Sequence, residues 1–360
     1  MTQLPLVNVW HFLTQVHKQK AYNLPFHVII IEMYSVFSDF IKDKQKICII
    51  QAENPDGDSL GSAIALSYLL KDIETTLYCP VDIPKYLRYF SDWGIVTNEF
   101  DYKADGYIIV DTAAKILLSK ILDDSAAKNR LYTAPVLVLD HHETPDDLDF
   151  PHQAIIETLP ACCSLIYKIA LAENLPIDKN VAETLLQGIL SDTLGLTSAS
   201  VTSDTFRDVA NLVDAGANIT ELEEHRREFM KKSKRILDYK ADLIKRIDYS
   251  LDDTLATILI PFEDIQNYSD EYNPGVLIIE EMRMVENVKV CVAIKTYPDG
   301  KLTGKIRTNV EAPIADQIAA YFGGGGHPYA AGFRTYDTNY ETILADLIDL
   351  IPKLLSSNES

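Results

Sequence analysis

The hydrophobic positions of the chain form short apolar runs that alternate with helical patterns. Between residues 46 and 140 these runs are KICIIQA, TTLYC, GYIIVD and APVLVLD. The segments between them, such as SLGSAIALSYLLKDI and AKILLSKIL, place apolar residues at helical spacing. Because strands that alternate with helices form βαβ units, this pattern predicts an α/β fold with a parallel sheet.

The rest of the chain has a second pattern. Helical periodicity over residues 181–215 is followed by the charged stretch ELEEHRREFMKKSKRILDYKADLIKRI, which is typical of a solvated helix joining two domains. From Asp248 onward, the strand patterns TLATILI, VKVCVAIKTY and LTGKIRT predict a smaller α/β domain with a turn at Pro298-Asp299-Gly300 and a terminal helix. We interpret GGGGHPYAAGF as a glycine-rich loop of this domain.

These patterns divide the chain into four segments. We expect an N-terminal extension of unknown role over residues 1–27 and a parallel-sheet domain over 28–217. A helical linker over 218–247 then leads to the smaller domain over 248–360. A length of 360 residues is sufficient for two domains of ordinary size.

Composition limits the class of protein. The opening residues lack the cationic and apolar regions of a signal peptide, and the apolar run near Val28 is too short to span a bilayer. The cysteines are odd in number and have no metal-binding spacing, which is typical of reduced thiols. We therefore expect a cytoplasmic protein with no membrane partner.

The formal net charge of −20 argues against a protein that holds long duplex nucleic acid on a broad basic surface. A short RNA or a small phosphorylated nucleotide is a compatible partner if metal ions, a few cations or backbone amides offset the repulsion locally. The sequence leaves a homodimer open.

Acidic residues follow two of the predicted strands. Asp56 and Asp58 lie in NPDGDSLGS, which follows a strand and opens a helix. Taken alone, this run also fits an ordinary turn with a helix N-cap. Asp111 ends the strand GYIIVD, where a carboxylate also fits the cap of the next helix.

A more specific signal is Asp140-His141-His142, which directly follows APVLVL. Two histidines beside an aspartate at the end of an apolar strand have no obvious structural task. Imidazole and carboxylate together suit divalent transition metals. Asp192 in QGILSDTLGLTS emerges from an apolar helical pattern, and a capping role stays open for it.

These acids indicate a metal site if they converge. The carboxyl ends of parallel strands meet at one edge of a sheet, so separate runs come together there. Two carboxylates about 4 Å apart repel by roughly 4 kcal/mol at an effective dielectric constant of about 20, so the cluster needs compensation. Two divalent cations about 3.5–4 Å apart supply it and activate a water for attack on phosphorus. Oxygen-rich ligation with one imidazole favours Mn²⁺, with Mg²⁺ or Co²⁺ as competitors.

The glycine-rich run is a candidate anion site. Without side chains, its backbone amides can approach an anion closely, and the following histidine adds a donor. The alternative is a flexible turn, which so many glycines would make entropically costly. The residues concerned are Gly323, Gly324, Gly325, Gly326 and His327.

Together these motifs resemble the DHH phosphoesterase superfamily with a DHH-associated C-terminal domain. They are most similar to its NrnA type of oligoribonucleases and 3′-phosphoadenosine 5′-phosphate phosphatases. In order, the motifs are NPDGDSLGS, the aspartate of IIVD, LDHH, the aspartate of LSDT and GGGGH. From about Val28 to the C-terminus, the resemblance implies a two-metal phosphoric ester hydrolase with its active site between a DHH domain and a substrate-binding domain.

The resemblance also implies roles for individual residues. Asp56 would bind the first metal, and Asp111 would bind both. The ligands of the second metal alone would be Asp58, His141 and Asp192.

Three further roles follow from the same resemblance. His142 would contact the scissile phosphate, and Asp140 would orient the histidine pair. Arg307 in GKIRT, together with the glycine loop, would hold the phosphates and terminal nucleotide of the substrate; Arg283 is a second candidate.

One position departs from the pattern of the superfamily. The expected metal-binding histidine four residues before Asp56 is Ala52, whose methyl group cannot ligate. Glu53 is a nearby source of oxygen, although strand alternation places Gln51 and Glu53 opposite Ala52. The open alternatives are a weakened hydrolase, a hydrolase with rebuilt ligation, and a nucleotide-binding or regulatory protein without turnover.

Overall fold

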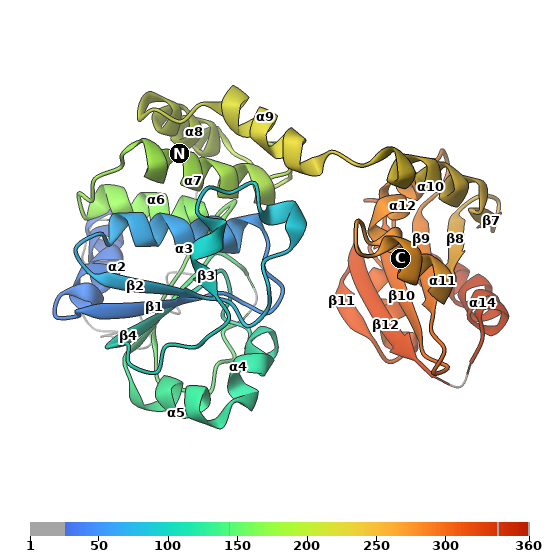
Figure 1. Ribbon diagram of the computed structural model, residues 1–360, viewed down its shortest axis with the longest axis horizontal. Coiled ribbons are helices and arrows are strands. Elements are labelled where there is room, and N and C mark those ends of the chain that lie inside the picture. The colour runs from blue at the N-terminus through green and yellow to red at the C-terminus, as the bar shows by residue number, and fades with distance from the viewer. Residues whose placement is uncertain (1–25, 144, 337, 359–360) are drawn as a thin grey trace. The chain divides into compact units, whose positions relative to one another are not determined.

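The computed structural model describes residues 26–143, 145–336 and 338–358. Nearly all of the predicted N-terminal extension lies outside this part of the chain. The chain divides into two compact units, with the boundary between Lys231 and Lys232. Figure 1 shows both units, and each is described here by itself.

The first unit contains a six-stranded sheet in the order β3-β2-β1-β4-β5-β6. All of its neighbouring strands pair in parallel, which confirms the predicted fold class. The strands are β1 (Lys46–Ile50), β2 (Glu74–Tyr78), β3 (Val96–Thr97), β4 (Gly106–Val110), β5 (Val136–Asp140) and β6 (Gln153–Ile156).

Helices cover both faces of this sheet (Figure 1). Ile47 and Ile49 of β1 belong to the core on one face, whereas Cys48 and Ile50 belong to the core on the other. The first face packs against α2 (Phe26–Ile41), α3 (Gly57–Leu69), α6 (Cys162–Ala172) and α7 (Lys179–Asp192). The second packs against η4 (Lys115–Leu118), α4 (Ser119–Asp123) and α5 (Ser125–Thr133). The remaining elements are η2 (Lys85–Leu87), η3 (Trp93–Ile95), α8 (Ser203–Asp214) and α9 (Ile219–Met230).

The second unit contains a mixed six-stranded sheet in the order β11-β12-β10-β9-β8-β7. Only β8 and β9 pair in parallel within its described strands. The strands are β7 (Asp248–Ser250), β8 (Leu255–Ile260), β9 (Val290–Thr296), β10 (Leu302–Thr308), β11 (Gly325–His327) and β12 (Ala330–Thr335).

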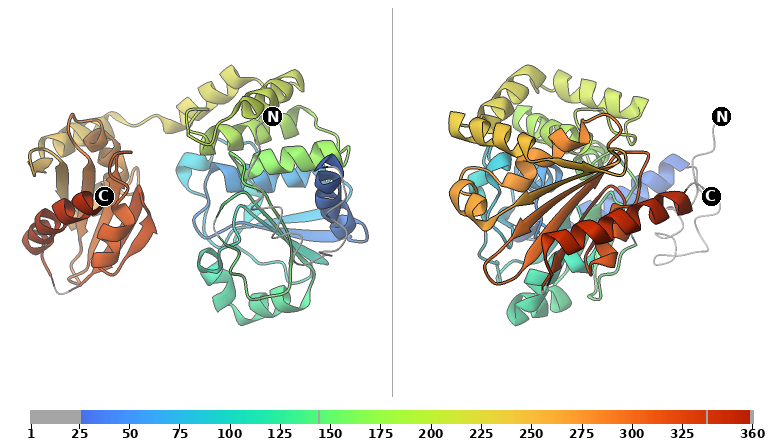
Figure 2. Two further views of the ribbon diagram at one scale, coloured as in Figure 1. Left: turned by 180° about the vertical axis from the view of Figure 1, so that it is seen from behind. Right: turned by 90° about the vertical axis from the view of Figure 1, so that its right-hand side faces the viewer.

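Two cores hold the second sheet. One lies between the sheet and α10 (Lys234–Lys245) and α12 (Pro274–Arg283), and α11 (Phe262–Tyr268) borders it. The other includes α13 (Ala315–Tyr321) and α14 (Tyr340–Asn358). Figure 2 shows α14 lying along one face of this sheet. No helix among the described residues is long and apolar enough to cross a membrane.

Two local predictions need correction. The charged stretch predicted as one helix contains two, α9 and α10, because Ser233 starts a new helix by accepting a hydrogen bond from the Ile236 amide. The glycine run is not wholly a loop, since residues 325–327 form the edge strand β11 against β12. A Cβ at Gly324 would lie 2.2 Å from the Gly332 oxygen, so close backbone approach requires glycine there.

Close packing of α3 against α7 depends on small residues. A Cβ at Gly61 of α3 would lie 3.2 Å from the Thr184 oxygen of α7. It would lie equally close to the Cys163 sulfur of α6, and a Cβ at Gly188 of α7 would lie only 2.2 Å from that sulfur. The Gly188 position also lies 3.2 Å from a carboxylate oxygen of Asp58. The two glycines therefore set how closely the helices approach around Asp58.

We predict that Gly188→Ala lowers the free energy of unfolding by about 1–3 kcal/mol, because a well-packed interior resists added atoms. Gly94→Ala is the matched control, since nothing lies within 4 Å of its Cβ position. Its effect should stay within about 0.5 kcal/mol. Urea denaturation measures both, and equal stability of the two variants would contradict this account of α3–α7 packing.

Candidate metal centre

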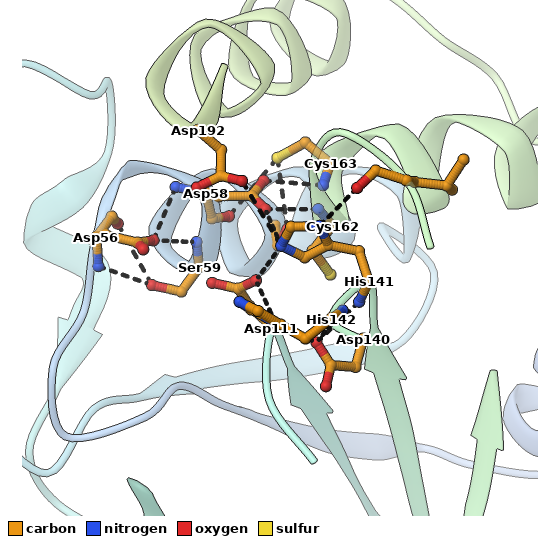
Figure 3. Close-up of polar contacts among 12 residues, drawn as sticks. Asp56, Asp58, Ser59, Asp111, Asp140, His141, His142, Cys162, Cys163 and Asp192 are labelled. Atoms are coloured by element: carbon orange, nitrogen blue, oxygen red, sulfur yellow. Dashed lines mark hydrogen bonds and ion pairs between the residues drawn. The ribbon is translucent and has the colours of Figure 1, made fainter. Parts of the chain in front are cut away.

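Four polar side chains converge at the carboxyl edge of the first sheet (Figure 3). Asp111 directly follows β4, and His141 directly follows β5. Asp58 lies in the first turn of α3, and Asp192 is the last residue of α7. The sheet thus gathers side chains from four separate sequence runs.

His141 is the centre of this group. Its Nε2 atom lies 3.3 Å from Asp111 Oδ1 and 3.7 Å from Oδ2 of both Asp58 and Asp192. Its Nδ1 atom donates a hydrogen bond to the Leu159 carbonyl at 2.8 Å. Because a carbonyl only accepts, Nδ1 carries the hydrogen, and the lone pair of the neutral ring is on Nε2. This lone pair faces three carboxylates.

Burial makes the carboxylate group costly without a cation. It raises the pKa of Asp58 and raises that of Asp111 well above the usual range. Burial also raises the pKa of Asp192 to about 6. Asp111 Oδ1 and His141 Nε2 have no hydrogen-bond partner although both are buried. A divalent cation would satisfy both atoms and offset the repulsion, so the residues present fit a metal ion.

The ligand atoms form two overlapping groups. Asp58, His141 and Asp192 offer atoms within 4.8 Å of one another, and so do Asp111, His141 and His142. The first group is the set predicted for the second metal. Oxygen and imidazole donors suit Mn²⁺.

The backbone of α6 stabilises Asp58, a contact that the sequence did not predict. The amides of Cys162 and Cys163, in the first turn of α6, donate to its two carboxylate oxygens at 2.5 and 2.9 Å. These amides have no partner within the helix, and the positive end of the helix dipole favours an anion. The contact orients Asp58 before any ion binds.

Asp111 has a strained backbone. Its φ angle of 64° is left-handed, which few residues other than glycine, asparagine and aspartate adopt readily. Its amide donates to the Leu139 oxygen at 2.8 Å, which continues the pairing of β4 with β5. The backbone turns at this residue while the strand end stays attached to the sheet.

Asp140 organises the two histidines. One of its oxygens accepts hydrogen bonds from the His141 amide at 2.8 Å and from His142 Nδ1 at 2.7 Å. The side-chain bond raises the pKa of His142. Because the His142 side chain is 44% exposed, its ring can carry a proton toward a bound ligand.

Asp56 is not brought into either ligand group. Its carboxylate instead caps α3 by accepting hydrogen bonds from the amides of Asp58 at 3.0 Å and Ser59 at 2.9 Å. The Ser59 hydroxyl accepts from the Asp56 amide in return, which completes a capping box. The residue is exposed, and both amide hydrogen bonds go to its Oδ1 atom.

The suggested replacement ligand Glu53 has another task. Its carboxylate accepts hydrogen bonds from the Ser119 hydroxyl at 2.9 Å and the Lys120 amide at 3.1 Å. It therefore stabilises the start of α4. Ala52 is buried, and the buried amide group of Gln51 beside it has no hydrogen-bond partner for either polar atom.

The second unit carries the predicted anion-binding residues. Arg307 lies on β10, and His327 of the glycine run pairs in register with Ala330, which also pairs with Arg307. Lys305 and Lys295, which the sequence did not single out, lie on the same face of the sheet as Arg307. Lys295 is paired with Thr303, and Thr303, Lys305 and Arg307 alternate along β10, so all of them point to one face. Burial lowers the pKa of Lys305, and the charges of Arg307 and Lys295 lower it further.

No carboxylate among the described residues forms an ion pair with these three cations. Arg283, the second candidate, donates instead to Glu280 at 2.9 Å. These three cations are half-buried, and the charge of Glu280 acts on Lys305 and Arg307 without a direct ion pair, so they are candidates for a local anion site in a chain of net charge −20.

Known proteins resemble this chain along most of its length. Residues 46–189 match the model described as "DHH family, N-terminal domain". The "Bifunctional oligoribonuclease and PAP phosphatase NrnA" of Thermus thermophilus is 28% identical over 304 residues, which cover 81% of this chain and 86% of that relative. A "Probable manganese-dependent inorganic pyrophosphatase" of Enterococcus faecalis is 28% identical over 216 residues, covering 56% of this chain and 65% of that protein.

A solved structure shares the fold. The crystal structure of an exopolyphosphatase-related protein from Bacteroides fragilis aligns with a TM-score of 0.77 at 20% sequence identity. The alignment covers 90% of this chain and 98% of that one. At this identity the likeness concerns the fold alone.

We predict that Asp111→Asn stabilises the metal-free protein by about 1–3 kcal/mol, because it removes a buried charge from a like-charged cluster. Asparagine tolerates the left-handed backbone, so the fold should persist. The variant should also lose most of the rise in melting temperature that Mn²⁺ gives the wild type. Asp149→Asn, which alters an exposed aspartate, is the control for scanning calorimetry. A full Mn²⁺ response in Asp111→Asn would show that the ion binds elsewhere.

Proton competition at Asp192 predicts a pH dependence. Its folded pKa of about 6 exceeds the unfolded value of about 3.9, so the folded protein retains a proton that the unfolded chain has lost between these values. The free energy of unfolding of the metal-free protein should therefore fall as the pH rises from about 4 to 6.

Mn²⁺ must displace the same proton. Titration calorimetry should show an affinity that weakens at least about tenfold per pH unit below 6. An affinity that stays constant from pH 7 to pH 5 would exclude Asp192 as a ligand.

Proposed function

We propose that this chain is a metal-dependent phosphoric ester hydrolase acting on short oligoribonucleotides or on the 3′-phosphate of adenosine 3′,5′-bisphosphate, because residues 46–189 match the DHH family model. The observation that carries the proposal is His141 Nε2, which faces the carboxylates of Asp58, Asp111 and Asp192 in an arrangement that suits a divalent cation. The oligoribonuclease and phosphatase relative, which spans most of the chain, supports the substrate class.

The metal ligands in this proposal are Asp58, Asp111, His141 and Asp192. Bound divalent ions, Mn²⁺ by analogy with the named pyrophosphatase relative, would supply Lewis-acid stabilisation of the phosphoryl group and a more acidic water. Asp56 could supply one further oxygen if its carboxylate no longer capped α3. The proposal includes two ions.

Residues of the chain perform the remaining steps. The hydrogen bond with Asp140 raises the pKa of His142 and so favours its protonated form. Its imidazolium would donate to a non-bridging oxygen of the scissile phosphate and neutralise part of the charge that develops there. Asp140 holds the ring in this orientation.

Arg307, Lys305 and the glycine run of the second unit would hold the terminal nucleotide of a substrate, because Arg307 and Lys305 are half-buried cations. A small substrate needs only such local cations, which reconciles an anionic ligand with the net charge of −20. The free, buried cysteines are compatible with activity in the cytoplasm.

The alternative function is nucleotide binding or regulation without efficient turnover. Ala52 motivates it, because the superfamily pattern expects a histidine ligand there and Glu53 is engaged with α4. Loss of one ligand would weaken the first of the two ion sites.

The test is a hydrolysis assay with Mn²⁺ on the 5′-phosphorylated adenylate dinucleotide pApA and on 3′-phosphoadenosine 5′-phosphate. We expect turnover of at least one substrate, and its loss in Asp111→Asn. Binding of both substrates without turnover would contradict the proposed enzyme and favour the alternative, a nucleotide-binding protein.

Ala52→His should separate these functions further. Restoring an imidazole ligand should raise the affinity for the weaker ion by roughly 10–100-fold, the scale typical of changes around metal ligands. Ala172→His, which adds an imidazole at the end of α6, is the control. Calorimetric titration with Mn²⁺ measures both. An unchanged affinity in Ala52→His would mean that the first site is already rebuilt or is absent.

A further inference from the structure

The first unit also contains a cavity large enough for a small ligand. The end of α7 and the helix α9 line a cavity of about 530 Å³, within the usual range of about 300–1,000 Å³ for small-molecule sites. Its wall is apolar at Leu190, Leu194 and Ile219 and polar at Tyr89 and Arg226. An apolar surface with one aromatic ring and a cationic edge matches the chemistry of a nucleotide.

The cavity shares a wall with the metal centre. Ser191 lines the cavity and directly precedes the ligand Asp192. Its side chain packs against Gly57, where a Cβ would lie 2.2 Å from the Ser191 oxygen. Gly57 separates Asp56 from Asp58, so a ligand in the cavity lies beside the acidic cluster.

The rim of the cavity is held in an unusual conformation. Leu194, Gly195 and Leu196 have φ angles of 52°, 71° and 68°. Left-handed leucine costs about 1–2 kcal/mol per residue and needs a compensating constraint. Here the Gly195 amide donates to the Leu190 oxygen at 2.8 Å, and the Leu196 amide donates to the Thr193 hydroxyl at 3.1 Å. The result is a leucine side chain, Leu194, that is 74% exposed at the edge of the cavity.

The opposite edge of the cavity is lined by two arginines and one glutamate. Arg226 donates two hydrogen bonds to Glu223, at 2.7 and 2.8 Å, and Arg227 donates to the same carboxylate at 3.1 Å. Two guanidinium groups therefore share one carboxylate among the residues that line the cavity, and some of their donors are unused. The acidic cluster at the metal centre would repel a phosphate. The two arginines on α9 could bind that phosphate beside the cluster.

We propose that this cavity binds the nucleoside next to the scissile phosphate, with its base against Leu194 and Ile219 and its outer phosphate on Arg226 and Arg227. This inference rests on the proposed function and deepens it, because it assigns the part of the substrate that the first unit recognises. A mononucleotide product occupies the same cavity after hydrolysis. The cavity thereby selects nucleotide esters over esters without a nucleoside.

The experiment uses the full chain with two cavity variants, Arg227→Ala and Ile219→Trp. Arg207→Ala is the matched control, because Arg207 is a similarly exposed helix arginine paired with Asp204 on α8. The first readout is the ratio of kcat/KM for pApA to kcat/KM for bis(p-nitrophenyl) phosphate, which has no nucleoside. The second is the affinity for 5′-AMP by calorimetry after metal removal. Circular dichroism and melting temperature confirm folding.

Each cavity variant should lower the kcat/KM ratio and the 5′-AMP affinity by roughly tenfold, the effect of one charged hydrogen bond or of lost apolar contact. Arg207→Ala should change neither. If both cavity variants behave like Arg207→Ala in 5′-AMP binding, the cavity assignment is overturned. If the wild type hydrolyses neither ester and does not hydrolyse 3′-phosphoadenosine 5′-phosphate, the proposed function fails, and the 5′-AMP affinities alone decide whether the cavity binds a nucleotide.

Discussion

The first unit depends on one electrostatic constraint, the meeting of three carboxylates around an unpaired imidazole nitrogen. Asp58, Asp111 and Asp192 surround His141 Nε2 at distances of 3.3 to 3.7 Å. Burial raises the pKa of each acid, so folding brings together groups that resist ionisation side by side. A divalent cation would convert this repulsion into ligation. The fold carries a cost that ion binding would recover, which is the usual condition of a functional site.

Neighbouring elements hold the cluster in place before an ion binds. The first amides of α6 fix Asp58, the Leu159 carbonyl fixes the tautomer of His141, and Asp140 fixes the ring of His142. Glycines let α3 and α7 approach closely around the same acid. Such preorganisation limits the movement needed during catalysis, which is how a protein stabilises developing charge. The cavity beside Ser191 extends this arrangement toward the substrate, because it joins an apolar wall and two arginines to the acidic edge.

Much of this architecture was predictable from the sequence, because apolar runs alternate with helical patterns and acids follow the strands. The parallel sheet follows from that alternation, and convergence of the acids follows from the shared edge. Contacts made by backbone atoms were not predictable. No side-chain pattern reveals that the Cys162 amide binds Asp58 or that Asp111 is left-handed. The glycine run was interpreted as a loop because composition does not show that Gly325 pairs with Gly332. The role of Glu53 in starting α4 depends on a contact 66 residues away along the chain.

The most direct test of the central claim is diffraction at the manganese absorption edge from crystals soaked in MnCl₂. Anomalous density should appear within about 2.0–2.6 Å of carboxylate oxygens of Asp58, Asp111 and Asp192 and of His141 Nε2. The His141 ring should keep its hydrogen bond to Leu159. An absence of anomalous density at these atoms in a correctly folded crystal would contradict the claim that a divalent cation balances the cluster.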